Sequence, residues 1–247
     1  MSDSMLIRPG IFNSFPELRC AISTRSGGVS PSPLGLNMSY RVGDEASNVD
    51  ENRRRFFQAL GVSAERLAVP QQCHSARVLL ADTPGTFDAV DGLVTDRSDL
   101  WLSVSVADCV PVFLFDVKKK AVAGIHAGWR GSAADIVGRG VHLMETEFSC
   151  VPSDLIAFVG PSAGPCCYEV GGEVAEQFGD GALLRRDGKL FLDLKAVARG
   201  QLLRKGVERE NIEVSPFCTI CSHELFHSFR RDGNRSGRML GIIGLKG

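Results

Sequence analysis

The chain has 247 residues, an apolar content of 44% and a formal net charge of −1, which together exclude a disordered, fibrous or strongly basic nucleic-acid-binding protein. No apolar run approaches the ~18 residues of a membrane span, and residues 1–15 lack the basic start and apolar core of a signal peptide. The eight cysteines are irregularly spaced, which favours reduced thiols over a disulfide scaffold. We therefore expect a cytoplasmic protein with a single domain over residues 1–247, without a nucleic-acid or membrane partner, and with a monomer as the favoured oligomeric state.

Short apolar runs bounded by turn residues predict strands along most of the chain. Residues 47–60, 133–148 and 193–205 have the periodicity of amphipathic helices, and residues 35–44 read as an irregular, functional loop. Because no regular βαβ rhythm occurs, we expect an α+β (mixed α/β) fold, a layered sandwich of mixed β-sheets flanked by helices. The predicted strands are residues 18–24, 76–80, 92–95, 100–106, 110–115, 121–126, 155–160, 212–215 and 238–243.

The helix of residues 47–60 carries an arginine among its apolar positions. Ser47 or Asn48 is expected to cap its N-terminus. Arg53 shares the stripe formed by Val49, Phe56, Phe57 and Leu60. Because an unpaired buried charge is costly, Arg53 is expected either to make a structural contact or to bind an anion or substrate.

The most informative pair in the sequence is Cys109 and His126. The runs 110–115 and 121–125 flank a charged segment and predict a β-hairpin. A short turn near residues 117–119 places Cys109 almost opposite His126, and opposed residues in a ladder have Cβ atoms about 5 Å apart. A thiolate and an imidazole at that spacing suit one shared metal ion.

A catalytic zinc site needs a third protein ligand and an open position. His74, which stands just before a predicted strand, is the best candidate among the five histidines. The segment 160–164 matches GxSxG, but Pro165 and two cysteines follow where a nucleophile elbow needs a helix. Cys218 and Cys221, with His223 and His227 behind them, resemble a metal cluster, but packed thiols and a hydrogen-bonded histidine pair are the favoured interpretation. The interval between this cysteine pair and the two histidines is too short for the usual zinc finger.

Motifs along nearly the whole chain resemble those of the YfiH-like family, often labelled multicopper polyphenol oxidase or laccase-domain proteins. Their order makes chance similarity improbable. The matching segments are residues 36–39, 42–44, 51–53, 72–74, 90–95, 107–111, 126–131, 160–161, 164–168, 218–219, 228–232 and 236–239.

The resemblance implies zinc ligands at His74, Cys109 and His126, in agreement with the hairpin argument. It also implies phosphorolysis of adenosine, inosine, guanosine and methylthioadenosine, together with adenosine deamination, so the expected partners are purine nucleosides and phosphate. The laccase label implies copper oxidation of phenols, and Cu²⁺ is therefore the alternative metal. The sequence departs from the family pattern at Arg41, where histidine is usual, and at Ser75, where glycine is usual.

Around the expected zinc we assign substrate roles as hypotheses. Arg53 is expected to contact phosphate or ribose, Asn37 and Ser39 to orient the sugar, and Arg130 and Arg230 to serve as reserve anion contacts. Asp108 is either an orienting or proton-carrying catalytic residue or a turn residue.

Three other interpretations of the function remain open. A copper polyphenol oxidase is the first, although five histidines are few for a multicopper site. A metal-free hydrolase with Cys109 as nucleophile and His126 as base is the second. A protein with a purely structural zinc is the third.

Overall fold

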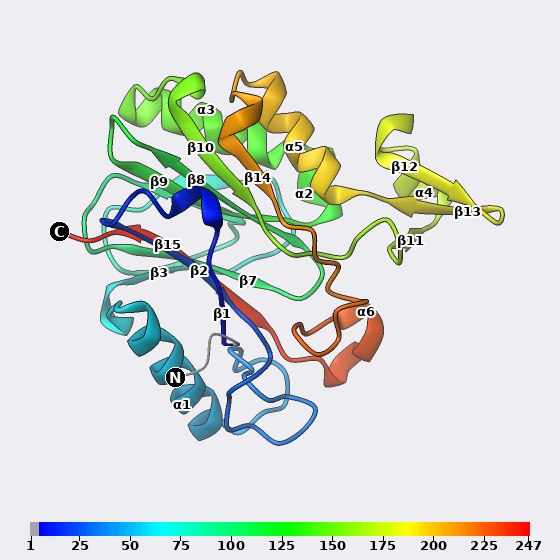
Figure 1. Ribbon diagram of the computed structural model, residues 1–247, viewed down its shortest axis with the longest axis horizontal. Helices are drawn as coiled ribbons and strands as arrows, with labels where there is room; N and C mark the ends of the chain where they lie inside the picture. Colours follow the sequence, from blue (N-terminus) through cyan, green and yellow to red (C-terminus); the bar gives the residue numbers. More distant parts are fainter. Residues whose placement is uncertain (1–4) are drawn as a thin grey trace.

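The computed structural model describes residues 5–247. Two six-stranded sheets pack face to face and helices cover both outer faces, giving an α/β/β/α sandwich (Figure 1). This confirms the predicted class of a layered sandwich of mixed sheets flanked by helices. Within residues 5–247, no helix is both long and apolar enough to cross a bilayer.

We call the sheet next to α1 the lower sheet and the other the upper sheet. The lower sheet has the order β1 (Leu6–Ile7), β2 (Leu18–Ser23), β15 (Met239–Leu245), β7 (Trp101–Val106), β3 (Leu67–Pro70) and β5 (Gly85–Phe87). The upper sheet has the order β14 (Ile212–Val214), β10 (Leu155–Val159), β8 (Val110–Asp116), β9 (Ala121–Ala127), β6 (Gly92–Thr95) and β4 (Val78–Leu80).

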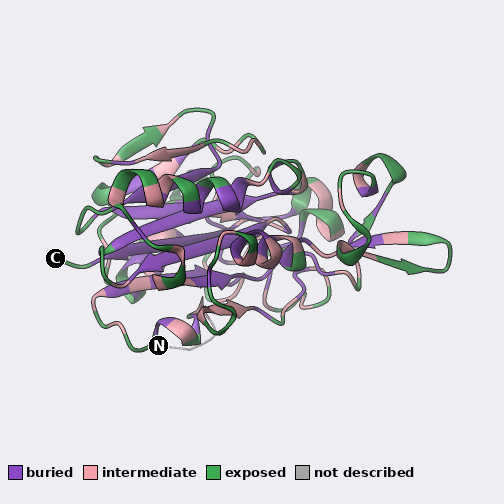
Figure 2. Ribbon diagram, turned by 90° about the horizontal axis from the view of Figure 1, so that it is seen from above, coloured by how far each residue is buried: buried purple, intermediate pink, exposed green. Residues whose placement is uncertain are grey.

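A small third sheet projects from the sandwich (Figures 1 and 2). It has the order β11 (Glu169–Val170), β13 (Lys189–Leu192) and β12 (Leu183–Arg186). The helices are α1 (Ala46–Leu60), α2 (Trp129–Ala133), α3 (Ile136–Phe148), α4 (Gly172–Ala175), α5 (Leu194–Arg204) and α6 (Phe229–Asp232).

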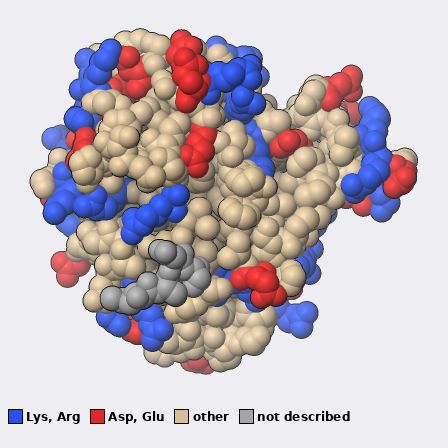
Figure 3. Space-filling model, viewed as in Figure 1, with Lys and Arg blue, Asp and Glu red and all other residues tan. Residues whose placement is uncertain are grey.

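Three apolar layers hold the sandwich together. The first lies between the upper sheet and helices α3 and α5, the second between the two sheets, and the third between the lower sheet and α1. The central strands are therefore buried on both faces (Figure 2). On the face in Figure 3, acidic and basic side chains are interspersed, in keeping with the near-neutral net charge.

The three helices predicted from the sequence are all present, but some of their ends differ from the prediction. The four residues of the apolar stripe of α1 are buried as predicted. The cap prediction is wrong: α1 begins at Ala46 and follows Glu45, whose side chain makes no capping bond. The helix predicted over residues 133–148 forms as α3, which begins later, at Ile136. Asp135, with a left-handed φ of 60°, separates it from the short helix α2, which ends at Ala133. Asp193 caps α5 as expected by accepting a hydrogen bond from the Ala196 N–H.

The β8–β9 hairpin forms, but its register differs from the prediction. Asp116 pairs with Ala121, and its Oδ1 accepts hydrogen bonds from the Lys118 and Lys119 N–H groups at 2.8 Å each, which closes a longer turn. As a result His126 lies opposite Pro111, and Cys109 is two positions further along. A shift of two residues keeps side chains on the same face of a sheet, so the two side chains remain neighbours on a diagonal.

Gly241 allows the two sheets to approach each other. A Cβ at this position in β15 would lie 2.5 Å from Cζ of Phe113 in β8. We expect Gly241→Ala to lower the free energy of unfolding by about 1–3 kcal/mol through overpacking, as measured by urea denaturation. In Gly124→Ala, the nearest contact of the new Cβ is 3.3 Å, and the loss should be smaller. Adding Phe113→Leu should offset part of the loss in Gly241→Ala, and equal stability of both glycine variants would contradict this account.

Candidate metal centre

The three predicted ligands come together although they stand far apart in the sequence. The ligand atoms of His74, Cys109 and His126 all lie within 4.8 Å of one another, and the two imidazole rings meet edge to face with centroids 5.0 Å apart. His74 comes from the loop between β3 and β4, Cys109 directly precedes β8, and His126 lies in β9. We call these three residues the triad.

One buried carboxylate organises the triad. The Asp91 carboxylate accepts hydrogen bonds from the backbone N–H groups of Cys73, His74 and Ser75 at 3.2, 2.9 and 2.7 Å, and from the Ser75 hydroxyl at 2.8 Å. Successive N–H groups that converge in this way form an anion-binding nest. The nest requires a left-handed residue, and His74 supplies it with a φ of 63°.

Asp91 also fixes the orientation of His126. Its Oδ1 lies 2.8 Å from His126 Nδ1. Burial alone would raise the pKa of Asp91, but the hydrogen bonds from His126 and Ser75 outweigh burial and hold the pKa well below its usual range. An ionised carboxylate only accepts hydrogen bonds, so Nδ1 carries a proton and Nε2 is the ring nitrogen left to bind a metal, which would displace any proton held there. Sequence reasoning missed this role, although Asp91 lies in a recognised motif.

The charges of the triad suit a cation. Burial opposes ionisation of Cys109, but the neighbouring His126 and His74 lower the pKa of its thiol to about 6. Burial would likewise lower the pKa of His126, but the Cys109 sulfur and the Asp91 carboxylate raise it. The pair therefore favours a thiolate, which is the form of cysteine that binds metal.

The space around the triad also fits a metal ion. A Cβ added to Gly128 would lie 2.9 Å from His74 Cδ2 and 3.2 Å from Cys109 Sγ, so glycine leaves this side of the ligands open. His126 is buried while His74 is exposed. Two imidazoles and a thiolate with an open side match a catalytic zinc site, which keeps its fourth position for water or substrate.

Asp108, predicted as a catalytic or turn residue, connects its own turn to the β14–α6 loop and to α6. Its Oδ1 accepts a hydrogen bond of 2.6 Å from the Thr219 hydroxyl, and its Oδ2 accepts one of 2.7 Å from the Arg230 N–H. Its φ of 87° is unusual for a residue with a Cβ. Asp108 thus holds the backbone turn that presents Cys109.

Two predicted arginines lie near the triad. Arg230 is exposed, and its guanidinium lies 5.0 Å from the ring centroid of Tyr168. Tyr168 in turn is close enough to Cys109 for an electrostatic interaction. Arg130 follows Gly128 by two residues and stacks on Trp129 at 4.3 Å. Sequence reasoning missed Arg238, which interacts electrostatically with Asp108 and Cys109.

The other predicted substrate contacts lie elsewhere. Asn37 is fully buried, and all its hydrogen-bonding positions are used by Ser39, Asp44 and Arg238, so it shapes the loop and has no group left for a sugar. Ser39 is half-buried, and its Oγ accepts a hydrogen bond from the Arg41 N–H.

Arg53 makes a structural contact, one of the two alternatives that the sequence left open, while the histidines behind Cys221 differ from expectation. The Arg53 guanidinium stacks on Tyr40 at 5.1 Å and approaches Phe57 at 6.0 Å, on the α1 side of the lower sheet. The prediction of a hydrogen-bonded histidine pair is wrong. The ring nitrogens of the buried His227 have no hydrogen-bond partner among residues 5–247, while His223 is exposed and pairs with Glu224.

The fold and the triad define an α/β/β/α protein with an open His–Cys–His site able to hold a metal ion. Residues 19–246 match the family described as multi-copper polyphenol oxidoreductase laccase. The chain is 38% identical over 242 residues to the purine nucleoside phosphorylase YlmD of Geobacillus stearothermophilus, covering 90% of this chain and 88% of that protein. The crystal structure of YlmD covers 100% of this chain and 98% of its own, with a TM-score of 0.93 and 34% identity.

Two further relatives have related names. The purine nucleoside phosphorylase YfiH of Escherichia coli is 35% identical over 234 residues, covering 90% of this chain and 92% of that protein. The adenosine deaminase RL5 of an unknown prokaryotic organism is 36% identical over 222 residues, covering 83% and 84%. The chain belongs to the YfiH-like, laccase-like family, as its motifs indicated.

Removing the open space at Gly128 should impair metal retention. We expect Gly128→Ala to lower metal content, because its Cβ would displace His74 and Cys109. Gly171 is a matched control: both glycines precede a helix with nearly the same backbone angles, φ −76° and ψ 168° against φ −77° and ψ 169°, and a Cβ at Gly171 meets nothing within 4 Å. Elemental analysis of both purified variants tests this, and undiminished metal in Gly128→Ala would contradict it.

Neutralising Asp91 should weaken metal binding without removing a ligand. We expect Asp91→Asn to reduce metal affinity about 10–100-fold, because the amide no longer fixes the His126 tautomer. Competition with a chelator measures the affinity. Asp116→Asn provides the control, since Asp116 is equally buried but caps the β8–β9 turn. It should lower stability and leave metal affinity unchanged, and a similar loss of affinity in both variants would contradict the assignment.

Proposed function

We propose that this chain is a zinc-dependent purine nucleoside phosphorylase that also deaminates adenosine. The observation that carries the proposal is the solvent-open triad, with a carboxylate fixing one histidine and arginines beside it. The relatives named as purine nucleoside phosphorylases and as an adenosine deaminase support it. Adenosine, inosine, guanosine and methylthioadenosine are the proposed nucleosides, and the eight free cysteines fit a reducing cytoplasm.

Phosphate is proposed to bind at the arginines next to the triad. Arg230 is exposed, and Arg238 lies near Asp108 and Cys109. Guanidinium groups bind phosphate through paired, charge-assisted hydrogen bonds, which makes Arg230 and Arg238 the leading anion contacts and Arg130 a reserve. Arg53 is a less favoured contact for phosphate or ribose, because its guanidinium contacts Tyr40 and Phe57.

The purine and ribose are proposed to lie beside these arginines. The Phe229 ring is 49% exposed, and the Arg238 guanidinium lies 5.4 Å from its centroid. An exposed aromatic ring with a cation at its face suits stacking of a planar base. The Ser39 hydroxyl is the proposed ribose contact, while Asn37 holds the shape of its loop.

The side chains around the triad position the reactants. Asp91 keeps the proton on His126 Nδ1, and Asp108 holds the turn before Cys109. Zinc, when bound, would supply Lewis acidity for polarising water or substrate. In phosphorolysis, a phosphate oxygen held by Arg230 forms the bond to ribose C1′ as the bond from C1′ to purine N9 breaks. The purine leaves with the electron pair and takes a proton from solvent. In deamination, water adds at adenine C6 and ammonia leaves.

Two other activities share the same side chains. A copper polyphenol oxidase accords with the description of the matching family. A metal-free hydrolase would use the Cys109 thiolate with His126 as base. Oxygen uptake with phenols after copper loading would indicate the first, and turnover that survives chelation would indicate the second.

The decisive experiment compares two histidine variants in nucleoside assays with and without phosphate. His74→Gln should reduce base release from inosine about 100-fold or more, because the triad loses one ligand. His142→Gln is the control, since His142 is exposed on α3 outside the triad, and it should retain full activity. Chromatography of the products measures free base, ribose phosphate and inosine formed from adenosine. No phosphate-dependent base release from the zinc-loaded protein would overturn the proposal.

A further inference from the structure

Four cysteines gather at a second place, away from the triad. Cys166 and Cys167 lie in the loop between β10 and β11, and Cys218 and Cys221 in the loop between β14 and α6. Their sulfur atoms all lie within 4.8 Å of one another. Cys221 Sγ is 3.1 Å from Cys167 Sγ and 3.5 Å from Cys166 Sγ. These distances exceed the S–S bond of about 2.05 Å, and all four residues are free cysteines. We call them the cysteine cluster.

The spacing of the cluster fits one tetrahedral metal ion. With metal–sulfur bonds of about 2.3 Å, a regular tetrahedron places its sulfur atoms about 3.8 Å apart, within the range seen here. The Cys218–x–x–Cys221 spacing is also typical of zinc-binding turns. Four soft sulfur ligands favour Zn²⁺ over hard cations.

The surrounding backbone holds the sulfur atoms in place. The Gly164 N–H donates to Cys218 Sγ at 3.2 Å. A Cβ at Gly164 would lie 3.2 Å from Cys218 Cβ and 3.4 Å from Cys166 Sγ, so glycine lets the two loops meet through sulfur. The Thr219 N–H donates to the Ser162 carbonyl at 2.9 Å, which joins the loops a second time.

Positive charge lies next to the cluster. Lys195 is 8% exposed, and its ammonium donates to the carbonyls of Ser215 and Phe217 at 2.8 and 2.9 Å. It is close enough to Cys218 and Cys166 to interact electrostatically. The exposed Arg186 donates to the Cys166 carbonyl at 3.2 Å. Four thiolates around a divalent ion carry a net charge of −2, and these cations would offset it.

We propose that Cys166, Cys167, Cys218 and Cys221 form a second metal site, separate from the triad, that binds one Zn²⁺ with no position open for substrate. Four protein ligands complete a tetrahedral shell, so this zinc is structural. The proposal stands whether or not the chain acts on nucleosides.

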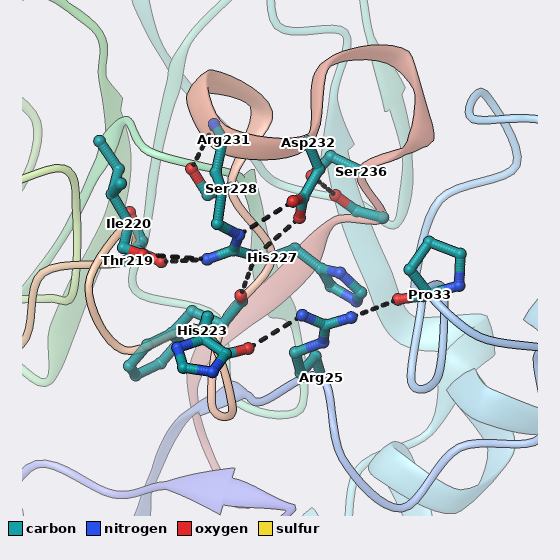
Figure 4. A network of polar contacts seen from close by, with 12 residues as sticks. Arg25, Pro33, Thr219, Ile220, His223, His227, Ser228, Arg231, Asp232 and Ser236 are labelled. Atoms are coloured by element: carbon teal, nitrogen blue, oxygen red, sulfur yellow. Dashed lines mark hydrogen bonds and ion pairs between the residues drawn. The ribbon is translucent and has the colours of Figure 1, made fainter.

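The location of the cluster gives this zinc a role in holding the catalytic loops. Thr219, between two of the cysteines, donates to Asp108. Arg231 Nη1 donates to the carbonyls of Thr219 and Ile220 at 3.0 and 3.2 Å, and its guanidinium pairs with Asp232 at 2.7 Å (Figure 4). Tyr168, which follows Cys167, lies beneath Arg230. A metal ion joining the two cysteine pairs would fix the distance between these loops.

Metal stoichiometry tests the proposal directly. Elemental analysis of the purified full chain should find about two zinc ions per chain. The variant Cys166→Ser/Cys221→Ser should bind one, and His74→Gln, which loses a triad ligand, should keep the zinc of the cluster. Cys20→Ser and Cys150→Ser remove buried cysteines outside the cluster and should keep both ions.

Cobalt substitution and thiol labelling test the cysteine cluster in folded protein. Co²⁺ added to metal-stripped His74→Gln should give intense thiolate-to-cobalt absorption, which is absent when Cys166→Ser/Cys221→Ser is combined with His74→Gln. Chelation of wild-type protein should raise the number of labelled thiols and lower Tm. The Tm loss should persist in His74→Gln and diminish in Cys166→Ser/Cys221→Ser.

Two outcomes would overturn the proposal. One is a single zinc in wild-type protein that disappears with His74→Gln. The other is an intact mass, measured without reductant, that shows a disulfide within the cluster of the freshly purified protein. Two bound zinc ions with no nucleoside turnover would reject the proposed function and keep this site, while turnover with one zinc would do the reverse.

Discussion

The structure around the triad depends on one buried charge. Asp91 has no exposed surface, and an uncompensated carboxylate there would be costly. Three consecutive backbone N–H groups, a hydroxyl and an imidazole compensate it. These bonds require the loop of residues 73–75 to curl with His74 in a left-handed conformation, and they orient His126. A single carboxylate therefore places two of the three ligands.

The sequence predicts those parts of the fold that have a local pattern. The apolar stripe of α1 is right because its burial follows the helical repeat, and the long central strands are right because they are continuous apolar runs bounded by turn residues. The strands β1, β5 and β11 have two or three residues each and carry too few side chains for a pattern. The hairpin register was wrong because an aspartate turn, closed by Asp116, lengthened the connection. The prediction that Cys109 and His126 are neighbours is nevertheless confirmed, because side-chain direction repeats every two residues in a strand.

The parts of the site that the sequence did not reveal depend on contacts between distant loops. Asp91 looks like an ordinary strand-edge aspartate until the loop carrying His74 folds over it. Arg238 and Tyr168 approach Cys109 from separate segments. Conversely, the sequence made Asn37 look available as a sugar contact. It is not, because Asp44 and Arg238 help to fill its hydrogen-bonding positions, and the sequence alone does not show that they lie beside it. Residue type identifies candidate ligands, but the hydrogen-bonding positions that a side chain has left for a substrate are known only once its neighbours in the fold are known.

Asp108 connects the triad to the cysteine cluster. Cys109 follows Asp108, whose left-handed backbone is unfavourable for a residue with a Cβ and persists only where surrounding bonds hold it. One of those bonds comes from the Thr219 hydroxyl, and Thr219 lies between Cys218 and Cys221. Movement of the Cys218–Cys221 turn would therefore remove one of the bonds that hold Asp108 in front of Cys109. A metal ion in the cluster would make the position of Cys109 depend on a site separate from the triad.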